Sequence, residues 1–313
     1  MTTQKPSLFT YLEVHWIVFI WGFTAILGRL IEVTALDLVW NRMVLALTLM
    51  WLWARWRQVP LKLPASSLLP LLATGGIIAL HWVTFYHAIR ISNISLTLAG
   101  LATSALWAAL IKALMQRKKP GVREWILSLM AIAAMTLLVQ VRTFPLFALG
   151  TAVLSAVLAA WFAVLNAGFT KQHPPLLVAC WEMLGGIAFL SLWLILQWGL
   201  GSGLAGEATH HSFPWPWLQP KPMDWFWLLV LAAVCTAYPF VASIRLMRQI
   251  DPFSFVLSVN MEPVYGIALG WLLFGQSELM SLPFYMGTAL LLGSVVADAL
   301  VQRIQYRRAL RLK

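Results

Sequence analysis

The chain has few charged residues and few cysteines for its length. Only 11% of its 313 residues are charged, with 11 acidic against 22 basic side chains, whereas soluble domains carry about a quarter charged residues. Cys180 and Cys235 both lie in apolar runs, so we expect buried thiols and no disulfide framework. The sequence has no GxxxxGK[ST] motif and no HExxH motif. These absences argue against a soluble fold, against ATP-driven work within this chain and against a zinc protease.

Long apolar runs dominate what is present. Hydrophobic residues make up 61% of the chain, and the mean hydropathy is +0.80. A helix needs about 20 residues to cross the hydrocarbon core of a bilayer, and runs of this length without period-two alternation favour helices over strands. The sequence predicts ten membrane-spanning helices, near residues 11–31, 36–54, 67–89, 93–115, 122–141, 147–169, 174–199, 224–245, 252–274 and 281–302.

The basic side chains predict the orientation. With the N-terminus inside, most Lys and Arg residues fall in cytoplasmic loops or in the C-terminal tail, which ends at Lys313. This bias follows the positive-inside rule, so we expect both termini on the cytoplasmic side of a bacterial inner membrane. The first apolar run has no small-residue cleavage site, and we interpret it as a retained helix rather than a signal peptide.

The chain also contains an internal repeat. Residues 92–116 align with residues 251–274, and the alignment sets Thr103-Ser104-Ala105-Leu106-Trp107 against Met261-Glu262-Pro263-Val264-Tyr265. Five helices per half is an odd number, so the second half must enter the membrane with inverted orientation. We therefore predict an all-α integral membrane protein of two inverted five-helix repeats, at 1–143 and 144–313. The second carries an outer loop at about 200–223 and a basic tail. Many secondary transporters are built this way, with the substrate site at the midplane between the repeats.

Several short motifs resemble a known family. Trp21-Gly22-Phe23-Thr24, Asn41-Arg42-Met43, Glu262-Pro263-Val264 and Phe274-Gly275-Gln276, taken in order, resemble the EamA-like family of the drug/metabolite transporter superfamily. The resemblance covers nearly the whole chain and implies a ten-helix inverted-repeat permease, often an exporter of amino acids or other small metabolites. The first repeat departs from the family in having Ser104-Ala105 where a proline is common.

Ionisable residues within the predicted spans are the candidate site. Such residues are costly in a bilayer and are expected to face a cavity or each other. Glu262 lies near the middle of its span beside Pro263, which removes a backbone donor and predicts a helix break. The predicted substrate-binding residues are Glu262, Asn260, Glu182, Arg42, His81, Ser104, Trp107 and Tyr265. The predicted proton-coupling residues are Glu262, Glu182 and His81.

Several roles stay open at this point. Arg42 and Glu182 align in the two repeats, so they either pair directly or each bind one end of a zwitterion. His81 is either a proton relay or a hydrogen-bonded packing residue. Lys112 either faces the site or extends towards the cytoplasmic interface. His210-His211 in the outer loop are a metal site, part of a lid, or part of an irregular interfacial loop.

These patterns favour a secondary transporter, and not an enzyme, that moves a small polar or zwitterionic metabolite such as an amino acid. Alternating access would carry the substrate, with proton coupling as one option. A lipid or lipid-linked sugar flippase and a membrane-embedded enzyme are the alternatives. We expect membrane lipid as a partner, no nucleic acid, no cofactor, no metal, and a monomer or homodimer.

Overall fold

Helices form every regular element that is described in the computed structural model, which covers residues 7–139, 145–199, 220–266, 269 and 282–311. Eight segments in this part of the chain are long and apolar enough to cross a membrane. The elements are α1 (Leu8–Leu30), α2 (Ala35–Trp56), α3 (Ala65–Ile91), α4 (Ile94–Leu101), α5 (Ser104–Met115), α6 (Val122–Val139), α7 (Leu146–Phe169), α8 (Pro175–Gly199), α9 (Pro222–Ala232), the π-helical turn η2 (Ala233–Ala237), α10 (Tyr238–Leu246), α11 (Pro252–Val259) and α13 (Leu282–Arg311).

Each of the ten predicted apolar runs contains helix. Only eight of the described helical segments are long and apolar enough by themselves to cross a membrane. The fifth run corresponds to α6, and the ninth begins with α11. Part of the ninth run, most of the predicted outer loop with His210-His211, the motif Phe274-Gly275-Gln276, and Lys313 all lie outside the described residues.

Polar side chains define where several helices begin. The hydroxyl of Ser7 accepts a hydrogen bond from the Thr10 amide at the start of α1, and Thr34 does the same for Asp37 at the start of α2. Such caps satisfy backbone donors that have no partner within the helix. Between these polar positions the apolar runs are long, and helices of matching length follow from them.

Glycines bring α3 and α8 unusually close. A methyl group built on Gly75 would lie 2.0 Å from the carbonyl oxygen of Glu182, and one on Gly185 would lie 2.3 Å from that of Leu72. Small residues at such contacts are typical of membrane helices, where close backbone approach supplies much of the packing energy. The α3–α8 pair therefore forms a tightly packed centre, to which α2 and α7 also pack.

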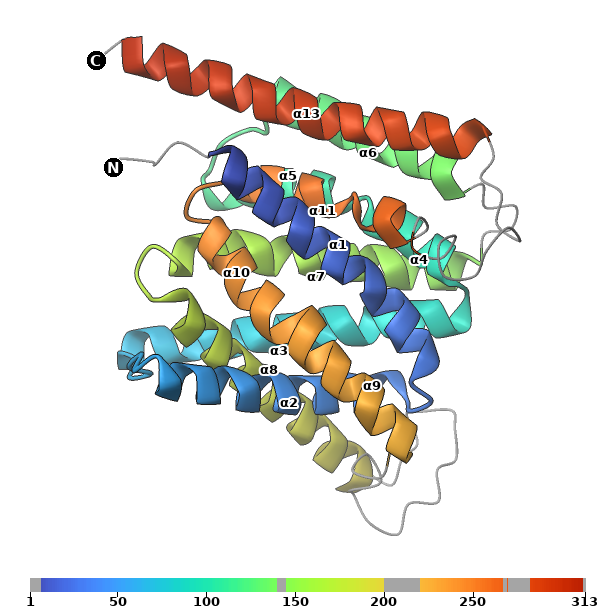
Figure 1. Ribbon diagram of the computed structural model, residues 1–313, viewed down its shortest axis with the longest axis vertical. Coiled ribbons are helices and arrows are strands. Elements are labelled where there is room, and N and C mark those ends of the chain that lie inside the picture. The colour runs from blue at the N-terminus through green and yellow to red at the C-terminus, as the bar shows by residue number, and fades with distance from the viewer. Residues whose placement is uncertain (1–6, 140–144, 200–219, 267–268, 270–281, 312–313) are drawn as a thin grey trace.

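The remaining helices surround this centre. α1 packs against α10 and α11, while α7 contacts α3, α4 and α5. α6 and α13 lie side by side as an outer pair, and α13 is the red helix at the top of Figure 1. Helices from the two halves of the chain thus interleave rather than forming two separate bundles (Figure 1).

Two helix interruptions occur at equivalent positions of the aligned repeats. The fourth predicted run is not one continuous helix, because turns at residues 102–103 separate α4 from α5. Its counterpart lies at residues 260–261, after α11, so the interruption begins before Pro263 rather than at it. The first interruption has no proline. There, Thr103 Oγ1 donates to the carbonyl of Gly100 across 2.8 Å, and this side-chain bond competes with the helical ladder.

Candidate functional site

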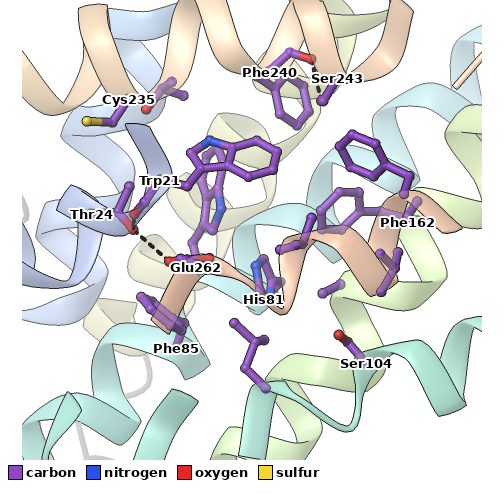
Figure 2. Close-up of a pocket in the computed structure, with 18 of the residues that line it drawn as sticks. Trp21, Thr24, His81, Phe85, Ser104, Phe162, Cys235, Phe240, Ser243 and Glu262 are labelled. Atoms are coloured by element: carbon purple, nitrogen blue, oxygen red, sulfur yellow. Dashed lines mark hydrogen bonds between the residues drawn. The ribbon is translucent and has the colours of Figure 1, made fainter. Parts of the chain in front are cut away.

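A cavity of about 90 Å³ lies where both halves of the chain meet (Figure 2). This volume holds several water molecules, so a larger ligand requires side chains or helices to move apart. Most of the wall is apolar or aromatic, with a few polar and ionisable groups. The lining residues are Trp21, Thr24, Arg42, His81, Trp82, Phe85, Leu101, Ser104, Ala159, Phe162, Ala163, Cys235, Thr236, Phe240, Ser243, Met247, Phe255, Val256, Val259 and Glu262.

Glu262 brings a carboxyl group to this cavity. It follows the interruption at 260–261 and is almost fully buried. Thr24 Oγ1 lies 3.4 Å from Glu262 Oε1 and 2.7 Å from the carbonyl oxygen of Trp21, so its single proton is shared between two acceptors (Figure 2). Because Pro263 has no N–H, it cannot donate to the preceding turn. For the side chain of Glu262, the hydrogen-bond partner among the described residues is the Thr24 hydroxyl on α1.

Arg42 also lines the cavity and is held there by three contacts. Its Nε donates to Thr236 Oγ1 across 2.7 Å, and Nη1 donates to Tyr86 Oη across 3.0 Å. The guanidinium carbon lies 3.9 Å from the centre of the Trp82 ring, within the range of a cation–π contact. Arginine has five N–H donors, so donors remain for an anionic ligand.

The π-helical turn η2 positions the partner of Arg42. Thr236 Oγ1 donates to the carbonyl of Leu231 across 2.7 Å, five residues earlier, and accepts from Arg42. Single π-turns inside long helices occur frequently at functional sites. Here the turn carries Thr236, whose side chain lines the cavity and accepts the hydrogen bond from Arg42.

His81 is fixed by α7. Its Nδ1 lies 2.9 Å from the carbonyl oxygen and 2.9 Å from the hydroxyl of Ser155. The ring also packs against Phe162, with a centroid separation of 5.5 Å. His81 thus lines the cavity and is hydrogen-bonded at the same time, which leaves both roles predicted from the sequence available.

The two helix interruptions meet beside the cavity. Ser104 Oγ donates to Asn260 Oδ1 across 3.2 Å, and Asn260 Nδ2 donates to the carbonyl of Ala102 across 3.2 Å. Ser104 lines the cavity, whereas Asn260 does not and links the two interruptions instead.

Glu182 is a predicted site residue that does not line the cavity. Its side chain is completely buried, and it accepts a hydrogen bond from Asn166 rather than from Arg42. The contact of Trp40 Nε1 with Ser191 Oγ, at 2.9 Å, and that of Met43 with Gly186 show that α2 and α8 run antiparallel. Arg42 and Glu182 are equally far from the starts of these helices, so they lie towards opposite ends. The structure therefore contradicts both alternatives: the two side chains form no direct ion pair, and Glu182 does not line the cavity in which it would bind one end of a zwitterion.

Three further residues that the sequence raised as candidates do not line the cavity. Tyr265 Oη is 2.9 Å from His15 Nδ1, and Trp107 Nε1 donates to Thr103 Oγ1 across 3.2 Å; neither ring lines the cavity. Lys112 forms ion pairs with Glu124 at 3.0 Å and Asp251 at 2.8 Å, which accounts for its charge without a ligand.

Sequence reasoning missed part of the lining. Thr24 belongs to the motif that resembles the permease family, but nothing along the chain indicates that it would contact Glu262. Phe162, Phe240 and Ser243 carry no signal that separates them from other apolar-run residues. Helical spacing from Trp21 and His81 would have pointed to Thr24 and Phe85, at i+3 and i+4 respectively.

The cavity combines a cationic group and a carboxyl group. A guanidinium and a carboxyl group share one apolar cavity, so a ligand with both charges finds complementary partners there. Within the described ranges, no three His, Cys, Asp or Glu side chains gather closely enough to hold a metal ion. Cys180 and Cys235 are both buried and unpaired.

Comparison with known proteins shows the fold but not the function. No family model and no curated protein matches the chain. A solved crystal structure, described only as that of a protein, is similar with a TM-score of 0.72 and 17% sequence identity, over 94% of this chain and 98% of the other. At this identity the likeness establishes a shared helical fold alone.

Proposed function

We propose that this protein is a secondary transporter for a small zwitterionic metabolite such as an amino acid. The observation that carries the proposal is the placement of Arg42 and Glu262 on one largely aromatic cavity between the two halves of the chain. Arg42 would hold the carboxylate of the substrate and Glu262 its ammonium group, while the aromatic wall favours an apolar side chain. Glu262 and His81 are also candidates to exchange a proton during transport.

The helix contacts support an arrangement of ten spans in two inverted repeats. In such an arrangement α7 would correspond to α1, α8 to α2, and the α9–α10 segment to α3. Each helix–helix contact should then have a symmetry-related contact between the corresponding helices. α3 packs on α8 as α2 packs on α9, and α3 packs on α7 as α1 packs on α10. α4 packs on α7 as α1 packs on α11. The matched interruptions at 102–103 and 260–261 agree with the same symmetry.

Alternating access is the mechanism that this proposed architecture would support. Motion of one set of helices against the other would open the cavity to either side of the membrane, with the interruptions as places where the helices bend. The loop charges favour cytoplasmic termini in a bacterial inner membrane. The small volume of the cavity fits a closed state that must open to load its substrate.

Counterflow in sealed vesicles tests this function. The purified protein is reconstituted, the vesicles are loaded with a single unlabelled amino acid, and uptake of the labelled form is measured across a panel. We expect substrate-dependent counterflow, its loss in Arg42→Met, and its loss or an altered pH dependence in Glu262→Gln. Glu32→Gln, the same chemical change on an exposed carboxyl, serves as the control. Absence of counterflow for every compound, or normal counterflow in both cavity variants, would reject the proposal.

A further inference from the structure

A second polar site lies between α7 and α8, apart from the cavity. Glu182 is fully buried about two turns into α8, and Asn166 is fully buried about one turn before α7 ends. Asn166 Nδ2 donates to Glu182 Oε2 across 3.3 Å. Neither side chain lines the cavity, so binding of a substrate there does not explain them.

Each member of this pair has a buried oxygen that lacks a donor. Glu182 Oε1 and Asn166 Oδ1 have no hydrogen-bond partner in the described part of the chain. Buried polar atoms without partners are costly, and most proteins avoid them. One proton on Glu182 Oε1 would serve both atoms, because the acid O–H could donate to Asn166 Oδ1. The carboxylic acid and the amide would then form a ring of two hydrogen bonds.

We propose that Glu182 and Asn166 form a proton-binding site, separate from the substrate cavity, that joins α7 to α8 when the proton is bound. When the proton leaves, the carboxylate faces the carbonyl oxygen of the amide, and two acceptors cannot bond. The Asn166 amide must then rotate, or α7 must shift against α8. This inference rests on the proposed transport function, in which the site would couple proton movement to substrate movement.

In the described part of the chain, no cationic side chain pairs with Glu182. The described residues of α7 include no titratable group, and none on the other helices in contact with α8 forms a hydrogen bond or ion pair with Glu182. Arg42 bonds to Tyr86 and Thr236, His81 to Ser155, and Arg245 to Glu13. The titratable and charged residues on the helices that pack against α8 are Asp37, Arg42 and Arg55 on α2, His81, Tyr86, His87 and Arg90 on α3, and Tyr238 and Arg245 on α10.

The site connects to the cavity through one face of α7. Ala159, Phe162 and Ala163 line the cavity, and Asn166 follows them at helical spacings of seven, four and three residues. Residues at these spacings share one face. A shift of α7 that follows the state of Glu182 would therefore move part of the cavity wall, including Phe162.

Infrared spectroscopy of the purified protein tests the proton site without any transport. Spectra recorded from mildly acidic to alkaline pH report protonated carboxyl groups. As the pH rises, we expect the wild type to lose the infrared band of a buried carboxylic acid. Glu182→Gln should lack this band at every pH. Asn166→Ala should keep that band at a shifted frequency, because the acid loses its amide partner. Identical titration spectra for the wild type and Glu182→Gln, both containing Glu262, would overturn the proposal.

Transport then separates coupling from substrate binding. Gln at position 182 can form the same two hydrogen bonds to Asn166, so the variant should fold and mimic the protonated state. We expect counterflow within about twofold of the wild type but no accumulation driven by a pH gradient, whereas Glu32→Gln should retain both. Gradient-driven accumulation in Glu182→Gln would overturn the coupling role. If the wild type transports nothing, the proposed function fails, and the infrared result still decides whether Glu182 binds a proton.

Discussion

Asn260 and Ser104 hold the two helix interruptions together. The Ser104 hydroxyl donates to Asn260 Oδ1 across 3.2 Å, and the amide of Asn260 donates to the carbonyl of Ala102 in the other interruption. The repeat alignment sets Ala102 against Asn260 and Ser104 against Glu262, so these contacts join equivalent parts of the two halves. A carbonyl that the interrupted helix leaves without its usual partner is thereby satisfied.

We predict that Asn260→Ala destabilises the protein. The change removes two buried hydrogen bonds and leaves the carbonyl of Ala102 without this donor, at a cost of about 1–3 kcal/mol. Ser104→Ala removes only one of the bonds and should cost less. Thermal unfolding in detergent compares the two with the wild type. Equal melting temperatures for Asn260→Ala and the wild type would mean that the contact does not stabilise the interruption.

A methyl group at the α3–α8 contact should disrupt packing. In Gly75→Ala the new carbon would lie 2.0 Å from the carbonyl oxygen of Glu182, so the two backbones must separate. We expect a lower melting temperature and loss of counterflow. Gly168→Ala on α7 is the matched control, because nothing lies within 4 Å of its added methyl group. That change should be neutral or stabilise the helix by up to about 1 kcal/mol. Similar behaviour of the two variants would contradict the close approach.

The partners of Arg42 should control its affinity for the substrate. Tyr86→Phe and Thr236→Val each remove one hydrogen bond that orients the guanidinium while keeping the shape of the side chain. We expect several-fold weaker substrate binding in each variant, measured by the concentration dependence of counterflow. Thr48→Val removes a threonine hydroxyl bonded to the Val44 carbonyl on the same helix, α2, and provides the control. Unchanged affinity in both partner variants would show that Arg42 does not hold the substrate.

Cysteine labelling tests the predicted topology. Glu32 lies between α1 and α2 on the predicted outer side, and Arg57 lies after α2 on the predicted inner side; both are exposed. In a background without Cys180 and Cys235, Glu32→Cys should react with an impermeant reagent in intact cells. Arg57→Cys should react only after the membrane is opened. The reverse pattern would place both termini outside and would contradict the charge argument.

The sequence by itself determined the helical class and indicated one of the two interruptions. Apolar runs of membrane-spanning length leave the backbone no stable alternative to helix in a bilayer, so the class follows from local composition. Pro263 indicated a break in the second repeat, slightly after the interruption that the structure shows at residues 260–261, whereas nothing in the sequence predicted the interruption at residues 102–103, where there is no proline. Arg42, His81, Ser104 and Glu262 were expected at the site because an ionisable or polar group inside a span must find a partner or a cavity.

Only the tertiary structure decided which of those groups share a cavity. Glu182 aligns with Arg42 in the repeats, but α2 and α8 run antiparallel, so equal positions along the helices put the two charges towards opposite ends. The contact of Thr24 with Glu262 joins residues 238 positions apart, and that of Arg42 with Thr236 depends on a π-helical turn. Helical periodicity indicates which residues share a face of one helix. Which faces meet depends on how the helices cross. That crossing depends on close contacts such as the approach of Gly75 to the backbone carbonyl of Glu182.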